Sequence, residues 1–169
     1  MGLIILACSC KSTKNNSRTK LDISKITLGT GCPDRATCVA EIKPNTRIDY
    51  KTETSTGKLN PEFMPDSTQN VVKIEFSVNQ DKKVMDAQYR ELVYFEVPKN
   101  VSELSLQDEA LQNVHFLFGR FCFCARETVG YFKVNSGKLK FKDGEFSIHV
   151  KNGKAPQKLR SISGTYIVD

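Results

Sequence analysis

Apolar and polar residues alternate in short runs along most of the chain. Residues 72–78, Val-Lys-Ile-Glu-Phe-Ser-Val, form the clearest run, and residues 89–97 form a second one that ends before Pro98. Successive side chains of a β-strand point to opposite faces, so a period of two buries one face and leaves the other in water. Both runs therefore predict half-buried β-strands.

The carboxyl-terminal half contains the strongest signals for paired strands. Residues 114–124, Val-His-Phe-Leu-Phe-Gly-Arg-Phe-Cys-Phe-Cys, are apolar on both faces, which is typical of a central strand covered on both sides. Beyond it, alternating runs are separated by Asp143-Gly144 and Asn152-Gly153. These dipeptides favour type I′ hairpin turns, whose two central residues need a positive φ. We therefore expect an antiparallel meander here.

Few segments depart from this strand pattern. Residues 101–113 can hold one or two helical turns, and residues 52–70, with Gly57, Pro61 and Pro65, are typical of a loop. About eight to ten short strands with at most one short helix predict an all-β fold, either an antiparallel β-sandwich or a small barrel. Since no linker or internal repeat interrupts residues 21–169, we expect them to form a single β domain.

Composition and charge narrow the range of partners. Of the 169 residues, 39% are hydrophobic and 26% are charged, which is ordinary for a globular protein. The net charge of +6 reflects basic residues at positions 9–20 and 133–160, without a nucleic-acid-binding motif. We therefore expect no nucleic-acid partner. No apolar run approaches the roughly 18 residues that a membrane-spanning helix needs.

The amino terminus has the order of an export signal. Residues 3–7 are apolar and end in a small residue, and residues 9–20 contain no large apolar side chain. The motif Ile5-Leu6-Ala7-Cys8 resembles the lipobox of bacterial lipoproteins. This resemblance implies that the signal segment 1–7 is removed and that Cys8 is acylated. The lipid bilayer is then a partner, because several acyl chains, at about 0.8 kcal/mol per buried CH₂, give stable anchoring.

The wider pattern of the chain resembles a bacterial group of lipoproteins. A lipobox, a polar tether over residues 8–20 that we expect to be disordered, and a Phe-rich β domain with paired cysteines resemble uncharacterised lipoproteins of Bacteroidota. In that resemblance, Ser9 after the acylated cysteine and the lack of an acid before Asp22 imply an outer-membrane location that faces the periplasm. The resemblance implies no particular activity.

One short motif resembles a modification site of the same bacteria. Asp66-Ser67-Thr68 is similar to the acceptor motif for O-glycosylation in Bacteroidota envelope proteins. It lies in the segment expected as a loop, where an enzyme can reach it. Ser67 is therefore a candidate glycosylation site.

The chain carries no recognisable catalytic motif. It has no Gly-x-Ser-x-Gly elbow, no His-Glu-x-x-His helix, no phosphate-cradling glycine-rich loop and no dinucleotide fingerprint. Of its two histidines, His149 alternates with apolar residues and should face solvent, and His115 begins the Phe-rich strand. Neither has an assignable nucleophilic partner, so we expect no catalytic residue, no cofactor and no enzymatic activity.

Four cysteines form the most informative constellation. Cys32 and Cys38 flank a turn, whereas Cys122 and Cys124 lie two apart on a predicted strand. Residues i and i+2 of a strand have Cα atoms about 6.6 Å apart and parallel Cβ vectors, which do not suit a disulfide. In an oxidising compartment we therefore expect both to be bridged to Cys32 and Cys38, in an order that the sequence leaves open, with Cys10 as the odd thiol.

Two other roles for these cysteines compete with structural bridges. Four thiolates can bind zinc, but neither pair has the usual Cys-x₂-Cys spacing, so no metal is expected. Cys122 and Cys124 can instead form a redox pair whose thiolates are stabilised by Arg120 and Arg126. Both arginines are also candidate ligand-binding residues.

Together these patterns favour a membrane-tethered lipoprotein of the cell envelope. Its β domain is expected to have a non-enzymatic role, either binding an envelope protein or ligand or supporting the structure of the envelope. The alternative is an envelope thiol–disulfide protein that uses Cys122 and Cys124. The reactivity of these two cysteines in the exported protein distinguishes the two functions.

Overall fold

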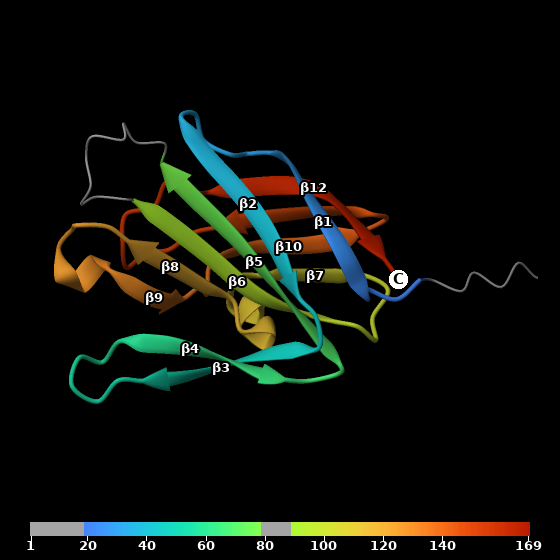
Figure 1. Cartoon of the computed structure of the whole chain (residues 1–169), viewed down its shortest axis with the longest axis horizontal. Helices are drawn as coiled ribbons and strands as arrows, with labels where there is room; N and C mark the ends of the chain where they lie inside the picture. The colour runs from blue at the N-terminus through green and yellow to red at the C-terminus, as the bar shows by residue number, and fades with distance from the viewer. Residues whose placement is uncertain (1–18, 79–88) are drawn as a thin grey trace, which may run out of the picture.

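Two antiparallel β-sheets pack face to face (Figure 1). The computed structural model describes residues 19–78 and 89–169, and in them the predicted all-β sandwich is confirmed. The smaller sheet has the strand order β1 (Ile23–Thr30), β12 (Ser161–Val168), β11 (Glu145–Val150), β10 (Gly137–Lys142) and β7 (Leu104–Gln107). The larger sheet has the order β2 (Ala36–Lys43), β5 (Gln69–Val78), β6 (Arg90–Pro98), β8 (Leu117–Phe121), β9 (Gly130–Lys133), β4 (Leu59–Pro65) and β3 (Thr46–Thr52).

The predictions about the amino terminus fall outside this range. The signal segment 1–7, the lipidation site Cys8, the odd thiol Cys10 and most of the predicted tether lie outside the described residues. Within residues 19–78 and 89–169, no helix is long and apolar enough to cross a membrane.

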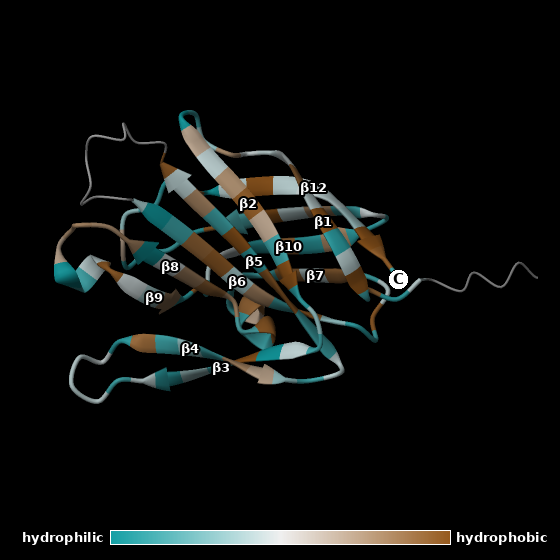
Figure 2. Ribbon diagram, in the orientation of Figure 1, coloured by the Kyte–Doolittle hydropathy of each residue, from teal (hydrophilic) through white to brown (hydrophobic). Residues whose placement is uncertain are grey.

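Alternation within the strands builds the core between the sheets. Figure 2 shows apolar and polar residues in turn along many strands, and the inward-facing apolar side chains are buried. Phe95 of β6 stacks on Phe116 with ring centroids 5.4 Å apart, and Phe141 of β10 stacks on Phe146 of β11 at 5.4 Å. Across the sheets, the Phe95 ring lies 5.9 Å from that of Phe141. Each such side chain contributes about 1.5–3 kcal/mol through burial, so these rings join the two sheets within a core of mainly aliphatic residues.

The carboxyl-terminal meander forms with one long connection. Asp143 and Gly144 have φ values of +53° and +81°, and they close the β10–β11 hairpin as a pair of positive-φ residues should. Asn152-Gly153 differs from the prediction, because it lies in a longer connection, residues 151–160, instead of forming a tight two-residue hairpin turn. The side chain of Gln157 holds this connection, since it bonds to the backbone near both of its ends.

A β-hairpin covers part of the outer face of the larger sheet. Residues 52–70 were expected as a loop, but they contain β4, which pairs along its length with β3. On its other edge β4 pairs with β9 at Leu59. Limited pairing on one edge is expected of β4, because Pro61 and Pro65 have no N–H to donate to a neighbouring strand. The fully buried Ile48 of β3 packs on the outward-facing apolar residues of β5, β6 and β8. The hairpin therefore forms a second, smaller core.

Two short 3₁₀ helices lie between strands of the second half. The helical turns expected over residues 101–113 begin later, because β7 comes first and η1 (Asp108–Val114) follows it. After η1, His115 adopts the left-handed conformation with a φ of +48°. η2 (Arg126–Thr128) lies between β8 and β9. The strand predicted over residues 114–124 is therefore shorter, and its last residues belong to a connection.

Candidate functional sites at the two ends of the sandwich

The four cysteines are bonded within each pair. Cys32 is bonded to Cys38 and Cys122 to Cys124, with Cα atoms 5.9 and 5.2 Å apart. The predicted bridges between the two pairs are therefore wrong, although all four cysteines are in disulfides. The geometric argument failed because β8 ends at Phe121, so that Cys122 and Cys124 lie in a bend and are closer than residues i and i+2 of a strand.

The Cys122–Cys124 disulfide lies on an exposed connection. It follows β8 and precedes η2, at the end of the sandwich opposite the carboxyl terminus (Figure 1). Cys122 is half-buried, Cys124 is exposed, and Phe123 between them is 92% exposed. This disulfide is therefore within reach of solvent and of a partner molecule.

Arg120 is the buried group that contacts this disulfide. It lies on β8 and is only 8% exposed. Its Nη2 donates to Cys124 Sγ at 3.3 Å, and its Nη1 donates to the Thr128 carbonyl oxygen at 3.3 Å and to the Thr128 hydroxyl. These bonds hold the bend against the end of β8. Of the two candidate arginines, Arg120 contacts the cysteines, whereas Arg126 is exposed on η2.

Arg120 also belongs to a chain of buried and partly buried hydrogen bonds. Arg120 Nε donates to the Tyr89 hydroxyl at 3.3 Å, and that hydroxyl donates to Glu91. Glu91 is fully buried on β6, where its carboxylate also accepts the backbone N–H groups of Lys158 and Leu159 at 2.7 Å each. Burial, together with the Glu91 carboxylate, raises the pKa of Tyr89 to about 12. Tyr89 therefore keeps its proton and remains a neutral link.

The charge of Arg120 has no direct counter-ion within the described part of the chain. No carboxylate there forms an ion pair with its guanidinium, and Glu91 is connected to it only through Tyr89. A buried charge is costly unless it is paired. Cys124 Sγ is the contacting atom that can supply a negative charge, because reduction of the disulfide converts it to a thiol that ionises.

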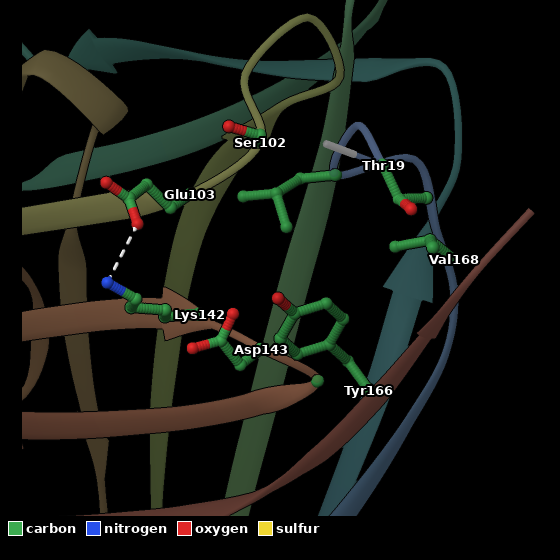
Figure 3. Close-up of a pocket in the computed structure, with 9 residues that line it drawn as sticks. Thr19, Ser102, Glu103, Lys142, Asp143, Tyr166 and Val168 are labelled. Carbon is green, nitrogen blue, oxygen red and sulfur yellow. Dashed lines mark ion pairs between the residues drawn. The ribbon is translucent and has the colours of Figure 1, made fainter. Parts of the chain in front are cut away.

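A pocket of about 330 Å³ lies at the opposite end of the sandwich, where the carboxyl terminus is labelled in Figure 1, and Val168 is part of its lining. Figure 3 shows its lining residues. An ion pair between Glu103 and Lys142, 3.3 Å long, forms one side of it, and the Asp143 carboxylate and Tyr166 hydroxyl lie on another. The lining residues come from four separate segments: Thr19, Leu21, Ser102, Glu103, Lys142, Asp143, Gly144, Tyr166 and Val168.

The pocket combines polar groups of different charge with an apolar floor. Burial raises the pKa of the Tyr166 hydroxyl, a hydrogen bond with the Gly144 backbone opposes that shift, and the Asp143 charge adds to it. Leu21, which is buried, supplies apolar surface to the same lining. Such a lining suits a small polar molecule. The sequence offered no signal for this site, since its residues are far apart in the chain and belong to no motif.

The remaining candidate residues lie elsewhere. His115 Nδ1 is hydrogen-bonded at 2.9 Å to the carboxylate of Glu96, a buried residue. His149 is exposed, as expected. Ser67 is exposed in the tight turn between β4 and β5. Among the residues that the structure describes, no group of three or more histidine, cysteine, aspartate or glutamate side chains is arranged to hold a metal ion.

The two ends of the sandwich differ in chemical specificity. The pocket offers general polar contacts, whereas a disulfide beside a buried cation points to one reaction, thiol–disulfide exchange. No protein-family model, curated protein or solved structure matches the chain.

Proposed function

We propose that this chain is an envelope thiol–disulfide protein that uses Cys122 and Cys124 as its reactive pair. The observation that carries the proposal is the Arg120 guanidinium, which is 8% exposed and donates to Cys124 Sγ at 3.3 Å. A cation in this position stabilises a thiolate much more than a neutral disulfide. Cys124 is therefore the better leaving group when a substrate thiolate attacks the bond.

A purely structural role explains this disulfide poorly. In the chain-entropy model, a bond that closes a loop of three residues stabilises the fold by only about 1.6 kcal/mol, against about 2.4 kcal/mol for the seven-residue loop between Cys32 and Cys38. Arg120 and Thr128 already hold the same bend through hydrogen bonds. The Cys122–Cys124 bond therefore adds little stability, while its exposure favours reaction with a partner.

The exchange balances with a dithiol substrate. A substrate thiolate attacks Cys122 Sγ and forms a new S–S bond, and the electron pair of the Cys122–Cys124 bond passes to Cys124. The second substrate thiol gives its proton to solvent, and the resulting thiolate attacks the substrate sulfur of this mixed disulfide, which releases Cys122 as a thiolate. The products are a substrate disulfide and a reduced protein pair. Two electrons pass from the substrate to the protein.

Anchoring through Cys8 completes the proposal. The lipobox-like Ile5-Leu6-Ala7-Cys8 supports export and attachment to the outer membrane, facing the periplasm. The periplasm is oxidising, and its newly exported proteins supply thiols that must be paired. An oxidising compartment also supplies the oxidant that regenerates the Cys122–Cys124 bond after each exchange.

A redox titration of the full chain tests the proposal. The protein is equilibrated with glutathione buffers of graded composition, and the alkylation of each cysteine is followed by mass spectrometry. We expect the Cys122–Cys124 pair to be reduced while Cys32–Cys38 stays oxidised, because only the first pair has a stabilised leaving thiolate. The double variant C122S/C124S is the matched control for oxidation of a reduced peptide. Resistance of the Cys122–Cys124 pair to every glutathione buffer contradicts the proposal.

Ligand binding in the pocket of Figure 3 is a second candidate function. The observation that favours it is the meeting of hydroxyl, carboxylate and ammonium groups over an apolar floor. Protein purified from its own envelope should then carry a small polar molecule, detectable as added mass in native mass spectrometry. The variant Asp143→Asn should weaken its retention, because a carboxylate contributes strong hydrogen bonds. Wild-type protein without added mass contradicts this function.

A further inference from the structure

We infer that Tyr89 is a positioning residue of the proposed exchange reaction, because its hydroxyl holds the Arg120 guanidinium against Cys124. This inference rests on the proposed function and adds a residue to its site. Tyr89 comes directly before β6, and its ring packs edge-on against Phe76 of the core, with centroids 6.2 Å apart. Its hydroxyl accepts from Arg120 Nε at 3.3 Å, whereas another atom of the same guanidinium, Nη2, donates to Cys124 Sγ. Tyr89 therefore acts on the cysteine through the arginine.

The direction of these hydrogen bonds makes the Tyr89 hydroxyl an acceptor for Arg120. A phenol has one hydrogen to donate, and Glu91 takes it, because an ionised carboxylate only accepts. The oxygen of the hydroxyl is then left to accept the Nε–H of Arg120, which only donates. Burial, together with the Glu91 carboxylate, raises the pKa of Tyr89 to about 12, so the hydroxyl keeps its hydrogen at pH 7.

Glu91 gives this arrangement a fixed base. It is fully buried on β6, and its two carboxylate oxygens accept the backbone N–H groups of Lys158 and Leu159, in the connection between β11 and β12. The guanidinium of Arg120 also lies over the Tyr89 ring, with its Cζ atom 5.4 Å from the ring centroid. A cation held in place stabilises a neighbouring negative charge without having to reorganise. The fixed hydroxyl therefore strengthens the effect of Arg120 on the thiolate.

The variant Tyr89→Phe removes the hydroxyl, keeps the ring and tests the inference. In the reduced full chain, we expect iodoacetamide to alkylate Cys124 about three- to tenfold more slowly at pH 7, because the cation remains but is no longer held on the sulfur. The same loss lowers the reduction potential of the Cys122–Cys124 pair by about 15–30 mV. Tyr131→Phe is the matched control. It removes a hydroxyl that interacts with Tyr94, and both measured values should remain those of the wild type.

A double variant shows whether Tyr89 acts through Arg120. Adding Tyr89→Phe to Arg120→Met should cause no further loss of Cys124 reactivity, because no cation is left to position. A purely structural tyrosine gives a different result, since Tyr89→Phe then lowers the thermal stability and leaves the alkylation rate and the reduction potential unchanged. If that is observed, or if the losses of rate from the two substitutions multiply, the inference is wrong and the proposed function stands.

A measurement on the wild type keeps the inference testable if Tyr89→Phe fails to fold. The Nε–H proton of Arg120 should exchange slowly with water in nuclear magnetic resonance spectra of both the oxidised and the reduced protein, because it is bonded to the Tyr89 hydroxyl. Rapid exchange in either state contradicts the inference. If the Cys122–Cys124 pair resists every glutathione buffer, the proposed function fails and the inference fails with it.

Discussion

Replacing Arg120 by methionine removes the cation that contacts Cys124 and keeps an unbranched side chain in its place. In the reduced protein, we expect this change to slow the alkylation of Cys124 at pH 7. The Arg120 Nη2 atom lies 3.3 Å from the Cys124 sulfur in the disulfide. Two unit charges about 4 Å apart interact by about 4 kcal/mol at an effective dielectric constant of about 20. Because Cys124 is exposed, water weakens the attraction between the guanidinium and the thiolate, and we take its magnitude as about 2 kcal/mol.

That energy sets the size of the expected effect. About 2 kcal/mol changes the ratio of thiolate to thiol about 30-fold, because each factor of ten corresponds to about 1.4 kcal/mol. Iodoacetamide reacts with the thiolate, so Arg120→Met should lower the alkylation rate at pH 7 by about 10- to 30-fold. Mass spectrometry of the peptide that contains Cys124 follows this thiol separately from the others. The two proteins should reach similar rates at high pH, where both thiols are ionised.

Two matched variants separate the effect of charge from an effect on folding. Arg126→Met removes an exposed cation two residues beyond Cys124 and should change the alkylation rate by less than about twofold. Arg120→Lys keeps a positive charge at the buried position and should recover much of the reactivity. Thermal melting followed by circular dichroism shows whether each variant is folded. Equal Cys124 rates in the wild type and a folded Arg120→Met variant would refute the reasoning that Arg120 stabilises the thiolate.

Other predictions concern the hairpin, the acid stability and the amino terminus. Ile48→Ala should cost the β3–β4 hairpin about 2–5 kcal/mol, and amide exchange should speed up there more than in the core strands; a uniform loss of protection would contradict a separable hairpin. A hydrogen bond from Lys99 lowers the pKa of Asp22 from its usual 3.8. The stability that ionised Asp22 contributes is therefore present above pH 3.8 and is lost as the pH falls through the lowered pKa. Asp22→Asn should make the free energy of unfolding in urea depend less on pH in this acidic range, and an unchanged dependence would count against this assignment. Cys8→Ala should release the protein from the membrane fraction, and a variant that still sediments with membranes would exclude lipid anchoring. Glycosylation of Ser67 predicts an intact mass above that of the chain, and an excess that Ser67→Ala does not remove would exclude this site.

The strands with one buried face were predictable, and the segments that depend on distant contacts were not. Residues 72–78 and 146–150 alternate strictly, and in both strands the apolar residues are buried, apart from the half-buried Val78 at the end of the first. β4 was not predicted, because Pro61 and Pro65 are typical of loops and its extended conformation depends on pairing with β3. The disulfide pairing was mispredicted for a similar reason. The end of β8 is held by Arg120 through Thr128, a contact that no local turn signal reveals.

The sequence contains a weaker signal for the disulfide site. Glu91 shares its strand parity with Val93 and Phe95, and Arg120 shares its parity with Phe118, so both charges fall at inward-facing positions. Charged residues at core positions indicate a buried polar network, because a buried charge is costly unless it is hydrogen-bonded or paired. The signal identifies two residues but not their shared partner Tyr89. The sequence contains no comparable signal for the pocket at the other end, because its polar residues do not interrupt an apolar pattern in their own segments.

The contact between Arg120 and Cys124 also sets the direction in which electrons flow under the proposed function. A cation that stabilises the Cys124 thiolate stabilises the reduced protein relative to the oxidised one, and this raises the reduction potential of the pair. For a two-electron couple, about 2 kcal/mol corresponds to a rise of about 40 mV. A disulfide made easier to reduce is a better oxidant for other thiols. The buried arginine therefore favours a protein that introduces disulfides into its partners over one that removes them.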